Sequence, residues 1–219
     1  MLSNFDAELK LVIAGNHDLE LDEGWCREHL DEDEDYLQDH ARAMEIMQGQ
    51  FARDAGRRSK YMFLFINRNN NDYAFPYKRS EDRFSVSGET AQGITSIAEN
   101  PMPGFAGVDI VMTHGPPKGI RDECKDGHQG CDHILRAIKR VKPLMHCFGH
   151  IYKGYGAHKV VWEESVMKKE IGLVNSYPRP TDVSVESEKE TLMVNAAILD
   201  GEHRPTNAPW ILNLDLPSA

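Results

Sequence analysis

The chain has 219 residues, of which 40% are hydrophobic and 27% charged, a composition typical of a globular protein with one sizeable core. Its formal net charge of −10 argues against a nucleic-acid polymer as a partner, because phosphate backbones are bound by basic surfaces. No apolar run reaches membrane-spanning length, so we expect no membrane partner, and the lack of a secretory signal and of any CxxC pair favours a cytoplasmic protein by default.

The first predicted element is the apolar run 11–14 in KLVIAGNHD, which is typical of a buried strand because four apolar residues stop at a glycine. An amide, an imidazole and a carboxylate follow it directly: Asn16, His17 and Asp18. Such groups bind metals and hydrogen-bond substrates. Taken alone, this stretch fits an ordinary strand-end turn better than a functional site.

The highly charged region 31–58 predicts an exposed amphipathic helix. Its apolar stripe consists of Leu37, Ala41, Met44 and Met47. The acidic run 31–35 indicates a solvated helix start rather than a calcium loop, because it lacks the glycine and the spaced oxygens of an EF-hand. A strand is expected at 61–66, before an asparagine-rich turn.

Two later apolar runs flank a predicted helix. The run 108–112 indicates a buried strand, and LMHCFGH (144–150) indicates a second one. Strand, helix and strand in about forty residues predict a βαβ unit with parallel pairing. Functional side chains in such sheets lie where the strands end, which is the position of His114 and His150.

The helix between these strands is expected to start at Asp132 as its N-cap and to stop at Pro143. Its apolar face consists of Ile134, Leu135, Ile138 and Val141. Beyond residue 158 we expect strands at 159–162, 191–199 and 208–216, separated by a long loop at 163–189.

Several other polar residues invite simpler interpretations. The pattern C-x3-H-x2-C-x-H, from Cys124 to His133, fits no familiar zinc module. Arg121 and Asp122 could reach a substrate from the loop after THGPP, but a surface salt bridge is the simpler interpretation. His146 in the middle of a predicted strand is interpreted as structural.

Three motifs in chain order carry a resemblance: GNHD (15–18), THGPP (113–117) and GHIYKGYG (149–156). With the tail segments VNAA and RPTNAPW, they resemble the calcineurin-like metallophosphoesterases, in the branch of brain protein 239-like proteins and their fungal relatives. The resemblance implies an α/β fold, a four-layer α/β/β/α sandwich with its site at the sheet edges. It treats 1–219 as a single calcineurin-like phosphoesterase domain.

The resemblance also implies roles for individual residues. Asn16, His114 and His150 match the ligands of the second of two metal ions. His17 matches the acid that assists a phosphoryl oxygen or leaving group, and Asp18 matches its orienter. Such pairs of ions polarise a phosphoryl oxygen and activate a water. The divalent metal would be Mn, Fe or Zn.

The ligands of the first metal have no match here. No D-x-H or G-D motif precedes residue 15, and the third position of the G-H-x-H motif is Tyr152, whose neutral phenol is a poor ligand. We therefore expect a fold incomplete at the N-terminus and at most one bound ion. Two accounts stay open: a truncated product or incorrect gene model, and a genuine degenerate member.

Two functional hypotheses follow. The first is a metal-dependent phosphoesterase-like hydrolase of phosphomonoesters or phosphodiesters, weak or inactive as this chain stands, with a phosphorylated small molecule or nucleotide as substrate. The second is a non-catalytic phosphoesterase-fold protein that binds one metal ion, a nucleotide or a protein partner. The number of metal ligands distinguishes them, and the oligomeric state is left open.

Overall fold

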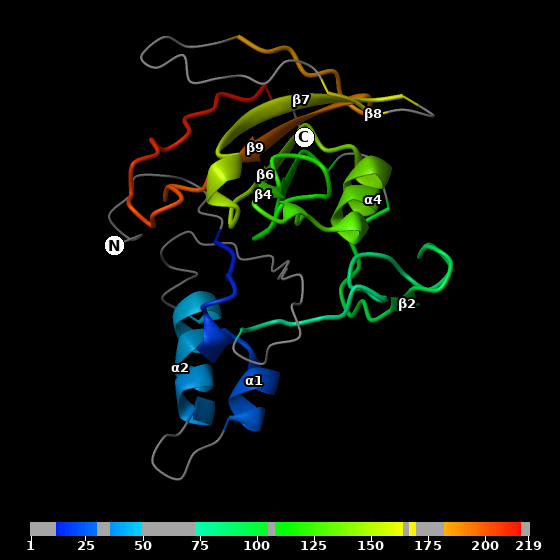
Figure 1. Ribbon diagram of the computed structural model, residues 1–219. Helices are drawn as coiled ribbons and strands as arrows, with labels where there is room; N and C mark the ends of the chain where they lie inside the picture. Colours follow the sequence, from blue (N-terminus) through cyan, green and yellow to red (C-terminus); the bar gives the residue numbers. More distant parts are fainter. Residues whose placement is uncertain are drawn as a thin grey trace. The chain divides into compact units, whose positions relative to one another are not determined.

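A computed structural model describes residues 12–29, 36–49, 73–104, 108–163, 167–169 and 182–215. The chain divides into two compact units, Met1–Arg79 and Ser80–Ala219, here called the N-terminal and the C-terminal unit (Figure 1). The single domain over 1–219 that the resemblance implies stays a prediction.

The described helices of the N-terminal unit are η2 (Leu19–Leu21), α1 (Glu23–Glu28) and α2 (Tyr36–Gln48). Asp22 caps α1, because its side chain accepts a hydrogen bond from Trp25 N at 3.2 Å and so satisfies a backbone amide that has no partner within the helix. Both α1 and η2 contact α2. A small apolar cluster of Ala14, Ala74 and Phe75, joined by Leu19 and Leu21, connects the two ends of this unit.

The sequence predictions for this unit are met in part. The helix expected over 31–58 is present as α2, with Met44 half-buried and Ala41 exposed. The predicted strand at 11–14 is wrong for its described part, because residues 12–15 belong to no strand. A strand needs a neighbour that shares its ladder of hydrogen bonds, and no described segment pairs with these residues. The acidic run 31–35 and the strand at 61–66 lie outside the described residues.

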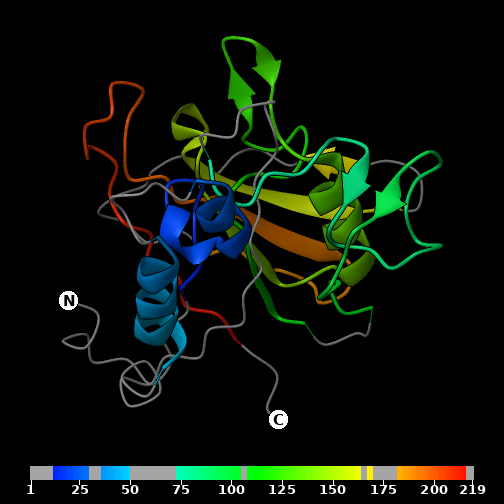
Figure 2. The same cartoon turned by 90° about the horizontal axis from the view of Figure 1, so that it is seen from below.

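A five-stranded sheet forms the C-terminal unit, in the order β3-β6-β9-β7-β8. Its strands are β3 (Ile110–Met112), β6 (Met145–Phe148), β9 (Glu190–Asn195), β7 (Gly156–Trp162) and β8 (Met167–Lys169). β3, β6 and β9 run parallel, whereas β7 is antiparallel to β9 and to β8. Figure 2 shows the yellow β7 beside the orange β9. The predicted βαβ unit is therefore confirmed, with β3 and β6 as direct parallel neighbours.

Helix α4 (Asp132–Val141) connects β3 to β6. Ile134, Ala137 and Ile138 are fully buried, while Lys139 on the other side is exposed, as expected for an amphipathic helix beside a sheet. The N-cap is Cys131 rather than Asp132, which is the first residue of the helix. The helix ends where Lys142 adopts the left-handed conformation, one residue before Pro143.

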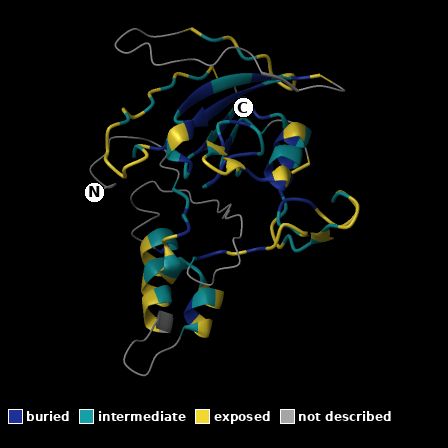
Figure 3. Ribbon diagram, viewed as in Figure 1, coloured by how far each residue is buried: buried dark blue, intermediate teal, exposed yellow. Residues whose placement is uncertain are grey.

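The last described segment of the chain also packs against the sheet. Trp210 and Leu212 pack against a cluster of Ala157, Leu192 and Val194, while Ile211 between them is 90% exposed. Figure 3 shows buried positions concentrated along β7. The alternation agrees with an extended segment, but the predicted strand at 208–216 is wrong over its described part. These residues contribute side chains to the core and no ladder pairing.

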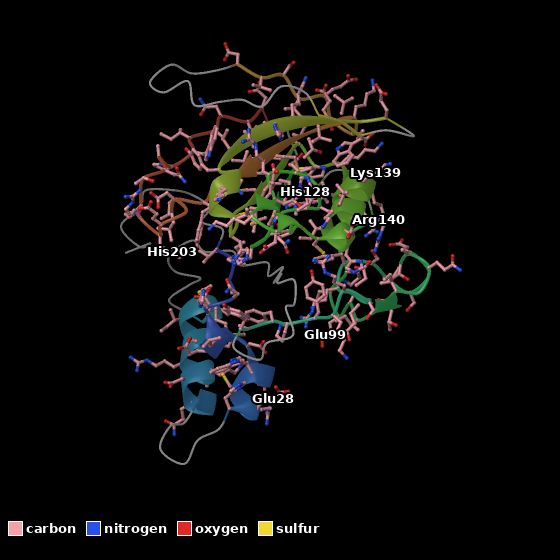
Figure 4. All side chains as sticks on the ribbon, in the orientation of Figure 1. Glu28, Glu99, His128, Lys139, Arg140 and His203 are labelled. Atoms are coloured by element: carbon pink, nitrogen blue, oxygen red, sulfur yellow. The ribbon has the colours of Figure 1, made fainter. Side chains whose placement is uncertain are left out.

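Shorter elements decorate the C-terminal unit: β1 (Glu81–Asp82) with β2 (Thr95–Ser96), β4 (Glu123–Cys124) with β5 (Gly127–His128), and η3 (Tyr152–Gly154). Arg140 of α4 attaches the segment 84–102 to the helix by donating to Phe84 O at 3.2 Å and Met102 O at 3.4 Å (Figure 4). The predicted loop at 163–189 contains β8, which the sequence analysis missed. No helix within the described ranges is long and apolar enough to cross a bilayer.

Candidate metal centre

His114 and His150 are carried by two turns that follow neighbouring strands. β3 is followed by Thr113 and His114, and β6 is followed by Gly149 and His150. Because these strands are parallel and adjacent, their ends lie at the same edge of the sheet. The two turns are also joined directly, since Gly149 N donates a hydrogen bond to His114 O at 2.9 Å.

The two imidazoles meet at this edge. Nε2 of His114 lies 3.1 Å from Nδ1 of His150, and the ring centroids are 4.9 Å apart at an interplanar angle of 58°. Both side chains are partly buried. Between neutral rings, one of the facing nitrogens donates its N–H and the other accepts through its lone pair.

This separation also suits two ligands of one metal ion. Imidazole nitrogens that share an ion through bonds of about 2.1 Å lie about 3.0 Å apart when the bonds meet at right angles and about 3.4 Å apart at the tetrahedral angle. The observed 3.1 Å between the nitrogens falls within this interval. The distance is compatible with two ligands of one divalent ion, in which case the facing atoms His114 Nε2 and His150 Nδ1 would be the ligand atoms.

His150 has an unusual backbone conformation. Its φ is +65°, and Ile151 N donates to Gly149 O at 2.7 Å across it. A hydrogen bond between residues i and i+2 with positive φ at the central residue defines the rare, strained form of the γ-turn. Such strain costs of order 1–3 kcal/mol and persists where the surroundings enforce it, typically at functional sites.

The segment after His150 is held by Asn195 at the end of β9. Its buried Nδ2 donates to Ile151 O at 2.9 Å and to Arg121 O at 3.2 Å. Gly154 approaches Arg121 O so closely that a Cβ would overlap it and the Asn195 amide. These contacts press η3 onto the loop that follows THGPP.

The contacts of the Arg121 side chain are hydrogen bonds to backbone carbonyls, so the surface salt bridge favoured from the sequence is wrong for Arg121. Asp122 does contact a half-exposed histidine, His128, and the reach of either residue to a substrate stays a prediction. The Arg121 guanidinium donates to Ala157 O at 2.9 Å and to Tyr155 O at 3.3 Å, and burial lowers its pKa. Asp122 is fully buried and accepts from Gly119 N and Gly130 N, both at 2.8 Å. Buried polar side chains are hydrogen-bonded in this way as a rule, and here most of the partners are backbone amides and carbonyls.

Tyr152 packs against another aromatic side chain. Its ring makes an edge contact with His203, with centroids 5.2 Å apart at 84°. In the cysteine–histidine pattern, His128 Nδ1 donates to Asp122 Oδ1 at 2.6 Å, and His133 contacts Arg136. Within the described ranges, no three His, Cys, Asp or Glu side chains gather into a metal-binding group.

The GNHD segment forms a tight turn in the N-terminal unit. Asp18 N donates to Gly15 O at 3.2 Å, and the Asp18 carboxylate accepts from Gly15 N at 2.6 Å. Asn16 is buried and its backbone carbonyl accepts from Ala74 N, while His17 is exposed with its ring edge-on to Tyr73. Asp18 therefore fixes the turn that carries His17, and the roles of Asn16, His17 and Asp18 at a metal site stay predictions.

Two residues near the candidate centre, Thr113 and Asn195, were not singled out from the sequence, and a third, His146, was interpreted only as structural. Thr113 Oγ1 donates to Gly115 O at 2.7 Å and lies 2.8 Å from His146 Nε2. His146 is fully buried, and burial lowers its pKa from 6.5 to about 3, so its ring is neutral. Thr113 was visible within THGPP, but only the structure shows what its hydroxyl contacts.

Comparisons with known proteins find relatives that are named for a metallophosphoesterase domain. The chain is 26% identical over 223 residues to "Metallophosphoesterase domain-containing protein 1" of Homo sapiens and equally to that of Mus musculus, a match that covers 99% of this chain and 58% of each relative. The similarity supports a metallophosphoesterase-type family. The chain thus spans less than two thirds of the length of these curated relatives.

Two further relatives are more distant or partial. A UPF0046 protein of Caenorhabditis elegans, K07C11.7, is 24% identical over 162 residues, which is 71% of this chain and 49% of that protein. "Probable rhamnogalacturonate lyase C" of Emericella nidulans is 29% identical over 163 residues, which is 70% of this chain and only 13% of the lyase. No family model matches the chain.

Proposed function

We propose that this chain is a metal-dependent phosphoesterase-like hydrolase of phosphomonoesters or phosphodiesters, built on the four-layer α/β/β/α fold of the calcineurin-like enzymes. The observation that carries the proposal is the 3.1 Å separation between His114 Nε2 and His150 Nδ1 at the ends of two neighbouring parallel strands. The relatives named for a metallophosphoesterase domain support it over nearly the whole chain.

In this proposal, His114 and His150 hold a divalent ion, Mn, Fe or Zn. When bound, the ion polarises a phosphoryl oxygen and lowers the pKa of its water. His17 is exposed, as a group that donates a proton to a substrate oxygen must be. Asp18 holds the turn that carries His17.

The substrate is proposed to be a phosphorylated small molecule or a nucleotide, because the net charge of −10 opposes binding of longer phosphate polymers. We propose that one ion is bound and that turnover is weak. The place where the resemblance expects a further ligand is occupied by Tyr152, which packs on His203.

A second candidate is a non-catalytic protein of the same fold that binds one ion, a nucleotide or a protein partner. The packing of Tyr152 on His203 favours it, because the position where the resemblance expects a further metal ligand is used for packing, which leaves too few ligands for a pair of ions.

One experiment separates these candidates. Zn²⁺ or Mn²⁺ binding and the hydrolysis of p-nitrophenyl phosphate and bis(p-nitrophenyl) phosphate are measured for the wild type, His114→Ala and His150→Ala. His158→Gln on β7 is the matched histidine control. Metal-dependent hydrolysis that both alanine variants lose supports the hydrolase. Binding of one ion without hydrolysis supports the non-catalytic candidate, and binding unaffected by either alanine variant rejects both.

A further inference from the structure

Two buried threonines make the same pair of contacts at opposite ends of the sheet. Thr113 follows the end of β3, and its hydroxyl joins Gly115 O and His146 Nε2. Thr191 lies near the start of β9, and its hydroxyl donates to Pro143 O at 2.6 Å and accepts from Trp162 Nε1 at 2.8 Å. Both threonines are fully buried. Only Thr113 lies at the edge that carries the imidazole pair.

The direction of the hydrogen bonds around Thr113 is fixed by chemistry. A hydroxyl has one proton, and a carbonyl can only accept, so the Thr113 proton goes to Gly115 O. His146 Nε2 must therefore carry the N–H that Thr113 Oγ1 accepts. The ring is a neutral imidazole with its proton on Nε2, and the series His146, Thr113, Gly115 forms a hydrogen-bonded relay.

His146 keeps this contact at a cost elsewhere on its ring. Its Nδ1 is buried and has no hydrogen-bond partner, which is an unfavourable state for a polar atom. An apolar residue at this position of β6 would avoid that cost. The presence of a buried imidazole is explained if its Nε2–H is needed to hold the Thr113 hydroxyl in its hydrogen bond to Gly115 O.

The relay acts on the residues that flank His114. Thr113 N donates to Cys147 O at 3.0 Å, and His114 O accepts from Gly149 N at 2.9 Å. These two hydrogen bonds connect the backbone of Thr113 and His114 to the end of β6. The relay adds a hydrogen bond from the Thr113 side chain to the carbonyl of Gly115, the residue that follows His114. Together these ties restrain the turn on both sides of the imidazole.

We propose that Thr113 and His146 are positioning residues that hold the His114 imidazole against His150, and that the relay thereby sets the affinity of the pair for a divalent ion. This inference rests on the proposed function, because it takes the His114–His150 pair to bind a divalent ion. When a residue that orients a metal ligand without binding the metal itself is mutated, the metal affinity typically falls by about 10–100-fold.

The test uses the full chain and Zn²⁺ as the probe. Dissociation constants are measured by calorimetry with a competing chelator for the wild type, Thr113→Val, Thr113→Ser and Thr191→Val, with thermal unfolding of each variant. We expect Thr113→Val to bind about 10–100-fold more weakly and Thr113→Ser, which keeps the hydroxyl, to bind like the wild type. Thr191→Val is expected to lower the unfolding temperature without changing affinity.

A second readout does not need the metal. Long-range ¹H–¹⁵N spectra of the metal-free protein report which nitrogen of each histidine carries the proton, and we expect His146 as the Nε2–H tautomer and a hydrogen bond between His114 and His150. Thr113→Val should remove both signatures, whereas Thr191→Val should keep them. These spectra test the inference even if Thr113→Val is too unstable for the calorimetric titration.

Several outcomes would overturn the inference. One is unchanged Zn²⁺ affinity in folded Thr113→Val, and another is an equal loss of affinity in Thr191→Val. If the wild type binds no Zn²⁺, the proposed function fails, and the spectra of the metal-free variants still decide whether the relay positions the pair. Unchanged His114 and His150 signals in Thr113→Val would then reject it.

Discussion

The side-chain amide of Asn195 donates to the carbonyl of Ile151 at 2.9 Å, which ties the end of β9 to the residue directly after His150. The second proton of the amide goes to Arg121 O, and Oδ1 accepts from Ala197 N at 3.1 Å. One buried side chain therefore hydrogen-bonds to three backbone segments. One of these contacts, to Ile151 O, holds the residue that directly follows the strained turn at His150.

Replacing this amide should be costly. Asn195→Ala removes the side-chain partner of Arg121 O and of Ala197 N and one of the two donors to Ile151 O, and we expect the free energy of unfolding to fall by about 2–3 kcal/mol. Urea unfolding of the C-terminal unit measures it. Asn207→Ala is the matched control, because Asn207 also donates to two carbonyls, Ala197 O and Leu199 O, but in a partly exposed loop. Equal losses in the two variants would contradict the role assigned to Asn195.

The close approach of η3 to the loop after THGPP predicts the effect of a single methyl group. In Gly154→Ala the new Cβ would overlap Arg121 O, so backbone must move, and we expect a loss of about 1–3 kcal/mol. Gly104→Ala is the control, because its Cβ would meet no atom within 4 Å. Urea unfolding compares the two, and a neutral Gly154→Ala would show that the packing of η3 on Arg121 is looser than described.

The buried carboxylate of Asp122 is expected to organise its loop without contacting substrate. Asp122→Ala removes the acceptor for Gly119 N and Gly130 N, so those amides should exchange their hydrogens faster and stability should fall by about 2–3 kcal/mol. His128→Ala removes only a half-exposed partner and should cost less than about 1 kcal/mol. Hydrogen exchange measured by mass spectrometry distinguishes the two, and a larger effect of His128→Ala would overturn this assignment.

The buried His146 ring predicts a pH dependence of stability. Its pKa is about 3 in the folded chain and 6.5 in its ordinary state, so between these values the unfolded chain binds more protons than the folded one. Stability should therefore fall as the pH is lowered from 6.5, by up to about 1.4 kcal/mol per pH unit from this group. Denaturant unfolding from pH 7.5 to 4.5, with a chelator present, should show a shallower slope for His146→Met. Parallel slopes for the two proteins would contradict the buried neutral ring.

The βαβ unit was predictable because its sequence signals are local and strong. The apolar run of β3, the apolar face of α4 and the run of β6 are each complete within a few residues, and β3 and β6 pair as expected. The same reasoning indicated that His114 and His150 would share a sheet edge. Their approach to 3.1 Å also depended on the link from Gly149 N to His114 O, which no pattern shows.

The errors came from segments whose state depends on distant partners. The extended segment 208–215 has the alternation of a strand, yet Trp210 and Leu212 pack on the sheet without joining its ladder. Periodicity identifies an extended segment and cannot say whether a neighbour accepts its hydrogen bonds. Arg121 was misread for a similar reason, because its acceptors at Tyr155 and Ala157 are more than thirty residues away.

X-ray absorption at the zinc edge, on the chain loaded with one equivalent of Zn²⁺, tests the central claim that the His114–His150 pair holds a divalent ion. The account predicts imidazole nitrogens at about 2.0–2.1 Å from the zinc, and the loss of this signal in His114→Ala and in His150→Ala. A shell of sulfur at about 2.3 Å, or nitrogen scattering that survives both substitutions, would contradict it.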